Sequence, residues 1–131
     1  MKRLILLTTL ALAATAPLAQ QWPQRPVRVI VPFPPGGSTD IIARLVTPHL
    51  GETFGQQFVV DNRGGAGGTI GSEIAARATP DGYTLAVIPS SYAGAAALYP
   101  LTFDPVKGIA PISMLGMGSF ILGVHPSLPA N

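Results

Sequence analysis

Hydrophobic residues along this chain gather in short blocks separated by runs rich in proline and glycine. Three blocks are typical of strands, because they are short and rich in β-branched and aromatic residues: 27–31 (VRVIV), 58–62 (FVVDN) and 83–88 (YTLAVI). A loop and then a stretch of helical character follow each block. This order predicts an α/β fold with right-handed crossovers, a mainly parallel sheet and helices on both faces.

The first predicted helix follows the loop after residue 31. We expect Ser38 to be its N-cap and Asp40 to stabilise its first turn as an anion. Pro48 predicts a kink or an early end. The apolar stripe expected on this helix consists of Ile41, Ile42, Leu45, Val46 and Leu50.

The rest of the chain predicts shorter elements. A helix of small residues is expected over Thr69–Ala78, and an alanine-rich helix is expected to stop by Pro100. The stretch 102–105 (TFDP) resembles a further helix start, with proline at the first helical position. Apolar stretches at Ile109–Leu115 and Phe120–Val124 predict two more strands.

The N-terminal 20 residues have the pattern of a secretory signal peptide. Lys2 and Arg3 precede an apolar run, Leu4–Ala14, and small residues follow it. This run is shorter than the roughly 20 residues that a membrane-spanning helix needs. We therefore expect residues 1–20 to direct export of a soluble protein, with no lipid anchor because the chain contains no cysteine.

Charge and composition exclude several classes of partner. The net charge of +2 arises from 8 basic and 6 acidic residues, and Lys2 and Arg3 account for the whole excess. The remaining charges balance and are interspersed, so the basic pI does not indicate a nucleic-acid partner. The lack of cysteine excludes disulfides, a thiol nucleophile and a cysteine-ligated metal.

Candidate chemistry lies in three loops that follow the predicted strands, at 32–40, 63–69 and 89–92. In parallel α/β sheets, ligands bind outside the carboxyl ends of the strands. Two of the loops are glycine-rich, all three carry hydroxyl groups, and helix N-termini offer free N–H donors. The pattern favours an anionic ligand, either carboxylate or phosphate. The alternative is that the glycines only form tight turns and the hydroxyls only cap helices.

Nucleotide binding is weakly supported. The glycines at 65, 67 and 71 are spaced one residue too long for a dinucleotide fingerprint, and Ser91 stands where an acid is needed. Lys107 is the one lysine outside the leader, and it is not in a phosphate-binding loop. A nucleotide-binding enzyme domain is kept as the alternative function.

No catalytic arrangement is evident. Neither His49 nor His125 accompanies a nucleophile or a pair of carboxylates at useful spacing. Asp40 is expected mainly to stabilise its helix rather than to orient a ligand. Arg63 fits two roles equally, binding a carboxylate or pairing with Asp61 or Asp40. We expect no catalytic residue, no cofactor and no metal site.

Three segments carry a family resemblance: RPVRVIVPFPPGGSTDIIARLV, VVDNRGGAGGTIGSEIAARATPDGYTL and ALYPLTFDPVKGIAPIS. In this order they resemble the substrate-binding receptors of tripartite tricarboxylate transporters, the Bug receptors. The resemblance runs from Pro26 to Pro129. It implies a periplasmic protein with a type II periplasmic-binding-protein fold. It also implies a small carboxylate ligand, which is handed to membrane subunits of the transporter.

The resemblance also implies which residues bind the ligand, through backbone N–H groups, hydroxyls and bridging waters. Gly64 replaces a proline that is usual in the family, and Gly108-Ile109 replaces a usual Asp-Phe pair. The expected ligand-binding residues are Phe33, Pro35, Gly36, Gly37, Ser38, Thr39, Asp40, Ala66, Gly67, Gly68, Thr69 and Ser90.

Length sets the domain expectation. Family members are more than twice as long as these 131 residues and have two lobes with a cleft between them. We therefore expect residues 21–131 to form the first α/β lobe of a truncated receptor whose second lobe is missing. A non-functional fragment is kept as a further alternative.

Overall fold

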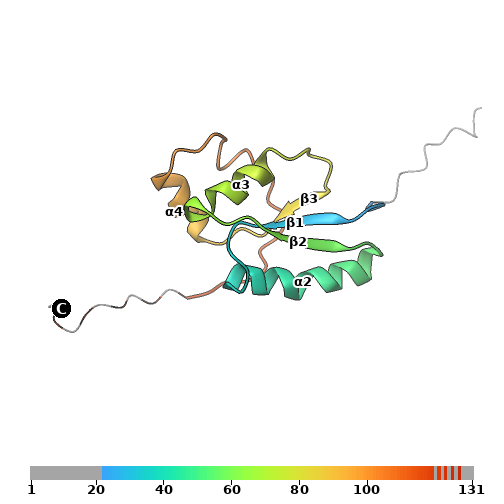
Figure 1. Cartoon of the computed structure of the whole chain (residues 1–131), viewed down its shortest axis with the longest axis horizontal. Coiled ribbons are helices and arrows are strands. Elements are labelled where there is room, and N and C mark those ends of the chain that lie inside the picture. The colour runs from blue at the N-terminus through green and yellow to red at the C-terminus, as the bar shows by residue number, and fades with distance from the viewer. Residues whose placement is uncertain (1–21, 120, 122, 124, 126, 128–131) are drawn as a thin grey trace, which may run out of the picture.

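The computed structural model describes residues 22–119, 121, 123, 125 and 127 (Figure 1). The predicted leader lies outside these residues. So do residues 120, 122 and 124 of the strand predicted at Phe120–Val124.

A three-stranded parallel sheet forms the centre of the fold (Figure 1). Its strands are β1 (Val27–Val31), β2 (Phe58–Asn62) and β3 (Thr84–Ala86), in the order β2-β1-β3. Val27 lies opposite Phe58, and Arg28 lies opposite Thr84. The first two strands match their predicted ranges, whereas β3 is shorter than the predicted range 83–88.

Helices lie on both faces of this sheet, as predicted (Figure 1). The long helix α2 (Ser38–Phe54) packs on β2 and β1 from one side. On the other side, α3 (Thr69–Ala76) packs on β1 and β3, and a short 3-10 turn, η2 (Ala66–Gly68), precedes it. The alanine-rich helix α4 (Ser91–Leu98) contacts η2 and α3.

The hydrophobic core lies between the sheet and α2. Val27, Val29 and Phe58 are buried there and pack against Leu50 of α2 and Leu85 of β3. Burying a side chain of this size contributes about 1.5–3 kcal/mol. Burial of these side chains therefore stabilises the packing of α2 on β1 and β2.

Helix α2 presents a different face to the sheet from the one its apolar pattern predicts. Ile41 and Leu45 are 53% and 65% exposed, whereas Ala43 is fully buried. Small residues face the sheet because they let the helix axis approach it closely, while Leu50 still reaches the core. The buried residues of α2 are Thr39, Asp40, Ala43 and Thr47.

The predicted N-cap of α2 and the predicted early end at Pro48 were wrong, whereas the alternative of a kink at Pro48 stays a prediction. The helix starts at Ser38 itself, with Gly37 as N-cap and no side-chain cap, so Ser38 is not the N-cap. The helix also continues through Pro48 to Phe54, which packs edge-on against Trp22. A proline inside a helix removes one hydrogen bond and crowds the carbonyl of the residue four positions before it. The contact between Phe54 and Trp22 stabilises the last turn against this cost.

The segment after α4 forms less regular structure than predicted. Asp104 does accept hydrogen bonds from the N–H groups of Val106 and Lys107, but only one turn forms and no helix follows. Ile109–Leu115 is not a strand and is mostly exposed. A strand needs a neighbouring strand for its backbone groups, and no described segment pairs with this one.

Gly71 in α3 tests how closely the helix and the first loop pack. A Cβ at this position would lie 2.6 Å from the Arg63 carbonyl oxygen and 2.7 Å from Pro32 Cα. We expect Gly71→Ala to lower the free energy of unfolding by about 2 kcal/mol, because backbone must move to make room. Gly94→Ala is the control, since a Cβ there meets nothing, and it should stabilise α4 by about 0.5–1 kcal/mol. Urea unfolding measures the free energy of unfolding of both variants. Equal changes in the two would contradict the close packing around Gly71.

The orientation of α2 can be tested with a matched pair on neighbouring faces. Leu45→Ser should change the free energy of unfolding by less than about 0.5 kcal/mol, because this side chain is mostly exposed. Ala43→Leu should cost about 1–3 kcal/mol, because the added carbons have no room against the sheet. Urea unfolding of the two variants measures the difference. A large loss of stability in Leu45→Ser with none in Ala43→Leu would mean that α2 packs on the sheet through the predicted apolar stripe.

Candidate functional site

Three loops lie at the carboxyl ends of the three parallel strands. The first loop (32–37) joins β1 to α2, the second (63–68) joins β2 to α3, and the third (87–90) joins β3 to α4. Parallel strands bring these ends to one edge of the sheet, where α/β proteins bind ligands. All the predicted ligand-binding residues lie in these loops or in the first helical turns after them.

The first and second loops touch each other. A Cβ at Gly64 would lie 3.1 Å from Pro34 Cδ, and one at Gly68 would lie 2.9 Å from Phe33 Cε2. The structure therefore places these two loops side by side, as the prediction of a shared ligand site requires.

The third loop is linked to this pair through α4. A Cβ at Gly67 would lie 3.0 Å from Tyr99 Cε2 and 3.7 Å from Ala95 Cβ. Ser90 is exposed and is the N-cap of α4, without a side-chain capping bond. Tyr99 and Ala95 were not predicted as site residues, although they line the second loop.

The second loop has a strained backbone. Four residues of this loop have positive φ, namely Gly65, Ala66, Gly67 and Gly68, and Ala66 at φ 47 is the one of these four with a Cβ. A left-handed conformation costs a residue with a Cβ about 1–2 kcal/mol. The N–H groups of Gly68 and Thr69 donate within the loop, to the carbonyl oxygens of Gly65 and Ala66, so donors for a ligand must come from elsewhere in the loop.

Hydrogen bonds within the second loop leave some donors available. Gly68 N–H donates to the Gly65 carbonyl oxygen, and Thr69 Oγ1 donates to the Ala66 carbonyl oxygen, each at 2.9 Å. Thr69 is buried, and its hydroxyl proton is already used. The N–H groups of Ala66 and Gly67, both exposed residues, donate to no residue that the structure describes.

The first loop divides its donors in a similar way. Gly36 N–H donates to Asp40 Oδ2 at 2.9 Å, so this group is not available to a ligand. The N–H groups of Gly37 and Ser38 have no partner among the described residues, and both residues are exposed at the start of α2. The helix N-terminus adds partial positive charge at this position.

Asp40 is a buried structural carboxylate. Its oxygens accept from Arg44 Nε at 3.0 and 3.1 Å, from Gly36 N–H, and from Asn62 Nδ2 at 2.9 Å. These bonds, first the one from Arg44, lower the pKa of Asp40 from 3.8 to about 2. Because the folded-state pKa is the lower one, their contribution to stability is complete above the unfolded-state pKa and is lost as the pH falls through 2. Stabilising the start of α2, not orienting a ligand, is the role that this geometry supports.

Asn62 was not predicted as a site residue, yet it links the first two loops. Its Nδ2 donates to the Phe33 carbonyl oxygen at 3.1 Å as well as to Asp40, and its Oδ1 accepts from Arg44 Nη2 at 3.1 Å. Its place at the end of β2 was the one signal in the sequence that could have pointed to it.

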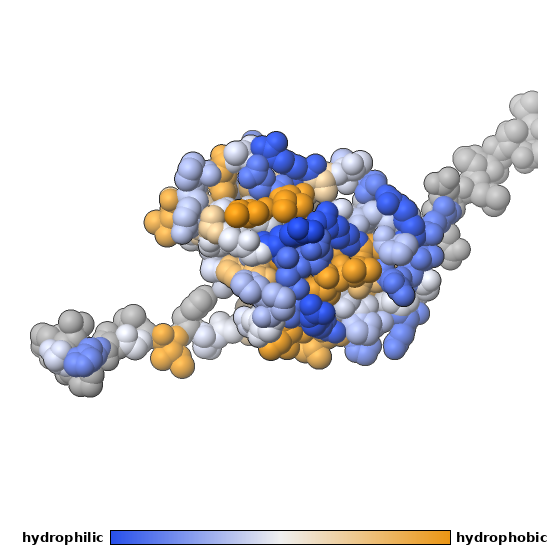
Figure 2. Space-filling model, viewed as in Figure 1, coloured by the Kyte–Doolittle hydropathy of each residue, from blue (hydrophilic) through white to orange (hydrophobic). Residues whose placement is uncertain are grey.

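Arg63 forms an ion pair with a carboxylate of the protein. Its Nε donates to Asp61 Oδ1 at 2.8 Å, and Arg28 Nε donates to the other oxygen of Asp61 at 2.7 Å. Burial raises the pKa of Asp61, but the bonds from the two arginines outweigh this and the pKa is lowered. In Figure 2 a strongly hydrophilic cluster occupies the centre of the face, with hydrophobic patches beside it. Of the two roles left open for Arg63, the structure shows the pairing with Asp61.

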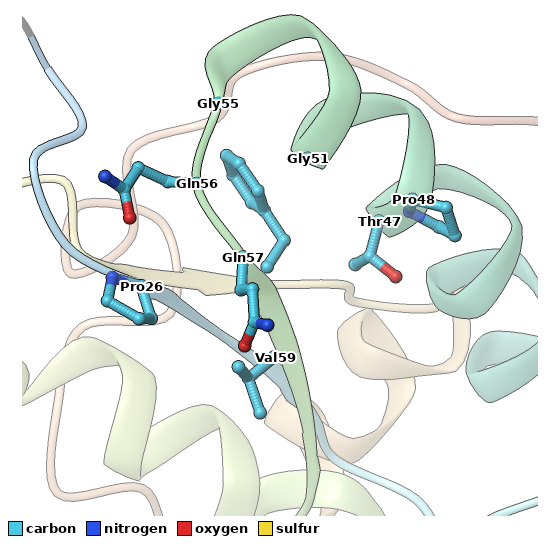
Figure 3. Close-up of a pocket in the computed structure, with 9 residues that line it drawn as sticks. Pro26, Thr47, Pro48, Gly51, Gly55, Gln56, Gln57 and Val59 are labelled. Atoms are coloured by element: carbon cyan, nitrogen blue, oxygen red, sulfur yellow. The ribbon is translucent and has the colours of Figure 1, made fainter.

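A separate hollow of about 720 Å³ lies at the opposite, amino end of β1 and β2 (Figure 3). Pro26, Gln57 and Pro48 are among its lining residues, and none of the lining residues is charged. Ligands of parallel sheets bind at the other end, so this hollow does not compete with the three loops as an anion site.

Two further properties concern the described part of the chain. None of its helices is both long and apolar enough to cross a membrane. Within the same residues, no group of three or more histidine, aspartate or glutamate side chains is placed to hold a metal ion.

The chain is similar to several named proteins in sequence and in fold. The chain is 39% identical to Protein BugT of Bordetella pertussis over 127 residues, which is 95% of this chain and 39% of BugT. Its structure is similar to that of MatC from Rhodopseudomonas palustris with bound malate, with a TM-score of 0.62 and 39% identity over 72% of this chain and 33% of MatC. Rpa4515 of R. palustris with adipate gives a TM-score of 0.53 and 44% identity, covering 54% of this chain and 24% of that one.

The chain spans about two fifths or less of the length of these relatives. Residues 42–131 match the TctC family, described as "Tripartite tricarboxylate transporter family receptor". This range is more than half of the chain, and it confirms the family and the periplasmic-binding-protein type of fold that the sequence predicts. The chain therefore belongs to the tripartite tricarboxylate transporter receptor family.

Proposed function

We propose that this chain provides the part of a periplasmic receptor that binds a carboxylate group of a small organic acid. One observation carries the proposal: two touching loops leave the N–H groups of Gly37, Ser38, Ala66 and Gly67 without a partner among the described residues. These donors lie at the ligand-binding edge of a parallel sheet, in a member of a carboxylate-receptor family.

The charges around the loops support a ligand held by neutral donors. Arg44 is engaged by Asp40 and Asn62, while Arg28 and Arg63 both pair with Asp61. A carboxylate is therefore met by backbone N–H groups and the N-terminus of α2, an arrangement that suits a singly charged group. Malate in MatC and adipate in Rpa4515 support this class of ligand.

Several further parts of the proposal follow from the family. We infer that residues 1–20 are a signal peptide, that residues 21–131 form the first lobe of a receptor with two lobes, and that the bound acid passes to membrane subunits of a transporter. We also infer that the chain is not an enzyme, since its relatives are receptors. The nucleotide-binding alternative has no such support.

Gly37 offers a direct test of the backbone donors. Its φ of −75° is close to the value that proline requires, so Gly37→Pro removes the N–H at a position whose φ suits proline. We expect Gly37→Pro to weaken binding of malate or adipate about tenfold or more, because a hydrogen bond to a charged group is lost. Isothermal titration calorimetry measures the affinity.

Gly37→Ala is the matched control, because it keeps the N–H and its Cβ would lie 3.7 Å from the Pro34 carbonyl oxygen, an ordinary contact. Equal affinity of the proline and alanine variants would exclude this N–H as a ligand donor. If neither acid binds the unaltered protein but ATP or NAD does, the nucleotide-binding alternative replaces the proposal.

A further inference from the structure

We propose that Asn62 is a positioning residue that sets the distance between the two ligand-binding loops. This inference rests on the proposed function, because it assumes that both loops contact the same ligand. Asn62 itself needs no contact with the ligand.

Asn62 is connected to the second loop through the chain and to the first loop through a hydrogen bond. It is the last residue of β2, so the second loop begins at the next residue along the chain. Its Nδ2 donates to the carbonyl oxygen of Phe33, which lies in the first loop. A movement of this side chain therefore changes the position of one loop relative to the other.

The orientation of the Asn62 amide is uniquely determined. Both of its N–H donors are used, one by the Phe33 carbonyl oxygen and one by Asp40 Oδ1, and its oxygen accepts from Arg44. A flipped amide would place its oxygen against two acceptors and its NH₂ group against a donor, which loses all three hydrogen bonds. An amide fixed in this way holds its neighbours in one arrangement.

The network extends from Asn62 to the proposed ligand donors. Asp40 accepts from Asn62 and also from Gly36 N–H, at 2.9 Å each. Gly36 directly precedes Gly37, whose N–H is the proposed donor of the first loop. Asn62 thus acts on the first loop through Phe33 and Asp40, and on the second loop through its own place in the chain.

An aspartate at position 62 would keep the shape of the side chain but not its function. It would have no N–H for the Phe33 carbonyl oxygen and would place a second carboxylate 2.9 Å from Asp40, with Arg44 as the shared cation. Asn62→Asp therefore removes the N–H donors and keeps the volume of the side chain, whereas Asn62→Ala removes both the donors and the volume.

The first measurement uses the ligand-free protein. We expect the backbone amide NMR signals of Gly36, Gly37 and Gly67 to shift in both Asn62→Ala and Asn62→Asp, because both loops move. Asp81→Ala is the control: Asp81 accepts from Arg25 and from Tyr83 N–H just before β3, at the other end of the sheet. Its loss should leave those three signals in place. Shifts confined to one loop, or equal shifts in the control, would overturn the proposal.

The second measurement compares affinity with stability. At a temperature well below unfolding, we expect both Asn62 variants to bind malate or adipate about tenfold more weakly or worse, since the loops no longer meet the ligand together. The affinity of Asp81→Ala for the same acid should stay within about threefold of the unaltered protein, even if its melting temperature falls as far as that of the Asn62 variants. An affinity that follows the melting temperature in all three variants would make Asn62 merely structural. If the unaltered protein binds neither acid, the proposed function fails, and the NMR shifts still decide the positioning role.

Discussion

The buried carboxylate of Asp40 is the interaction on which the rest of this structure depends. It joins the first loop through Gly36, the helix α2 through Arg44, and the end of β2 through Asn62. A charge buried without partners would be strongly unfavourable, so the loop, helix and strand must adopt positions that supply its donors. Asp40 lies on the same face of α2 as the small residues Thr39 and Ala43, which are buried, whereas Ile41 and Leu45 stay exposed.

Close backbone packing is the second constraint. Gly71 lets α3 lie against Pro32, and Gly68 lets the second loop lie against Phe33. These contacts bring two sets of N–H groups to the same edge of the sheet. The strained backbone of Ala66 at φ 47 is kept because its neighbours hold the loop from both sides.

Local sequence patterns predicted the elements well where each had a partner within the described residues. β1 and β2 have their predicted bounds, and the loops with the candidate ligand donors lie side by side as expected. Ile109–Leu115 has the same apolar character as those strands but forms none, because no described neighbour pairs with it. Asp104 likewise begins a turn that does not become a helix.

The sequence by itself determined the order of strands and helices, the glycine-rich loops, the balanced charge after residue 3 and the family. These follow from local periodicity, from turn residues and from short motifs. Only the tertiary structure decided that Asp40 binds Arg44 and Asn62, that Arg63 pairs with Asp61, and that Asn62 holds the first loop. The physical reason is that Asp40 and Asn62, 22 residues apart in the chain, meet only when α2 packs on β2.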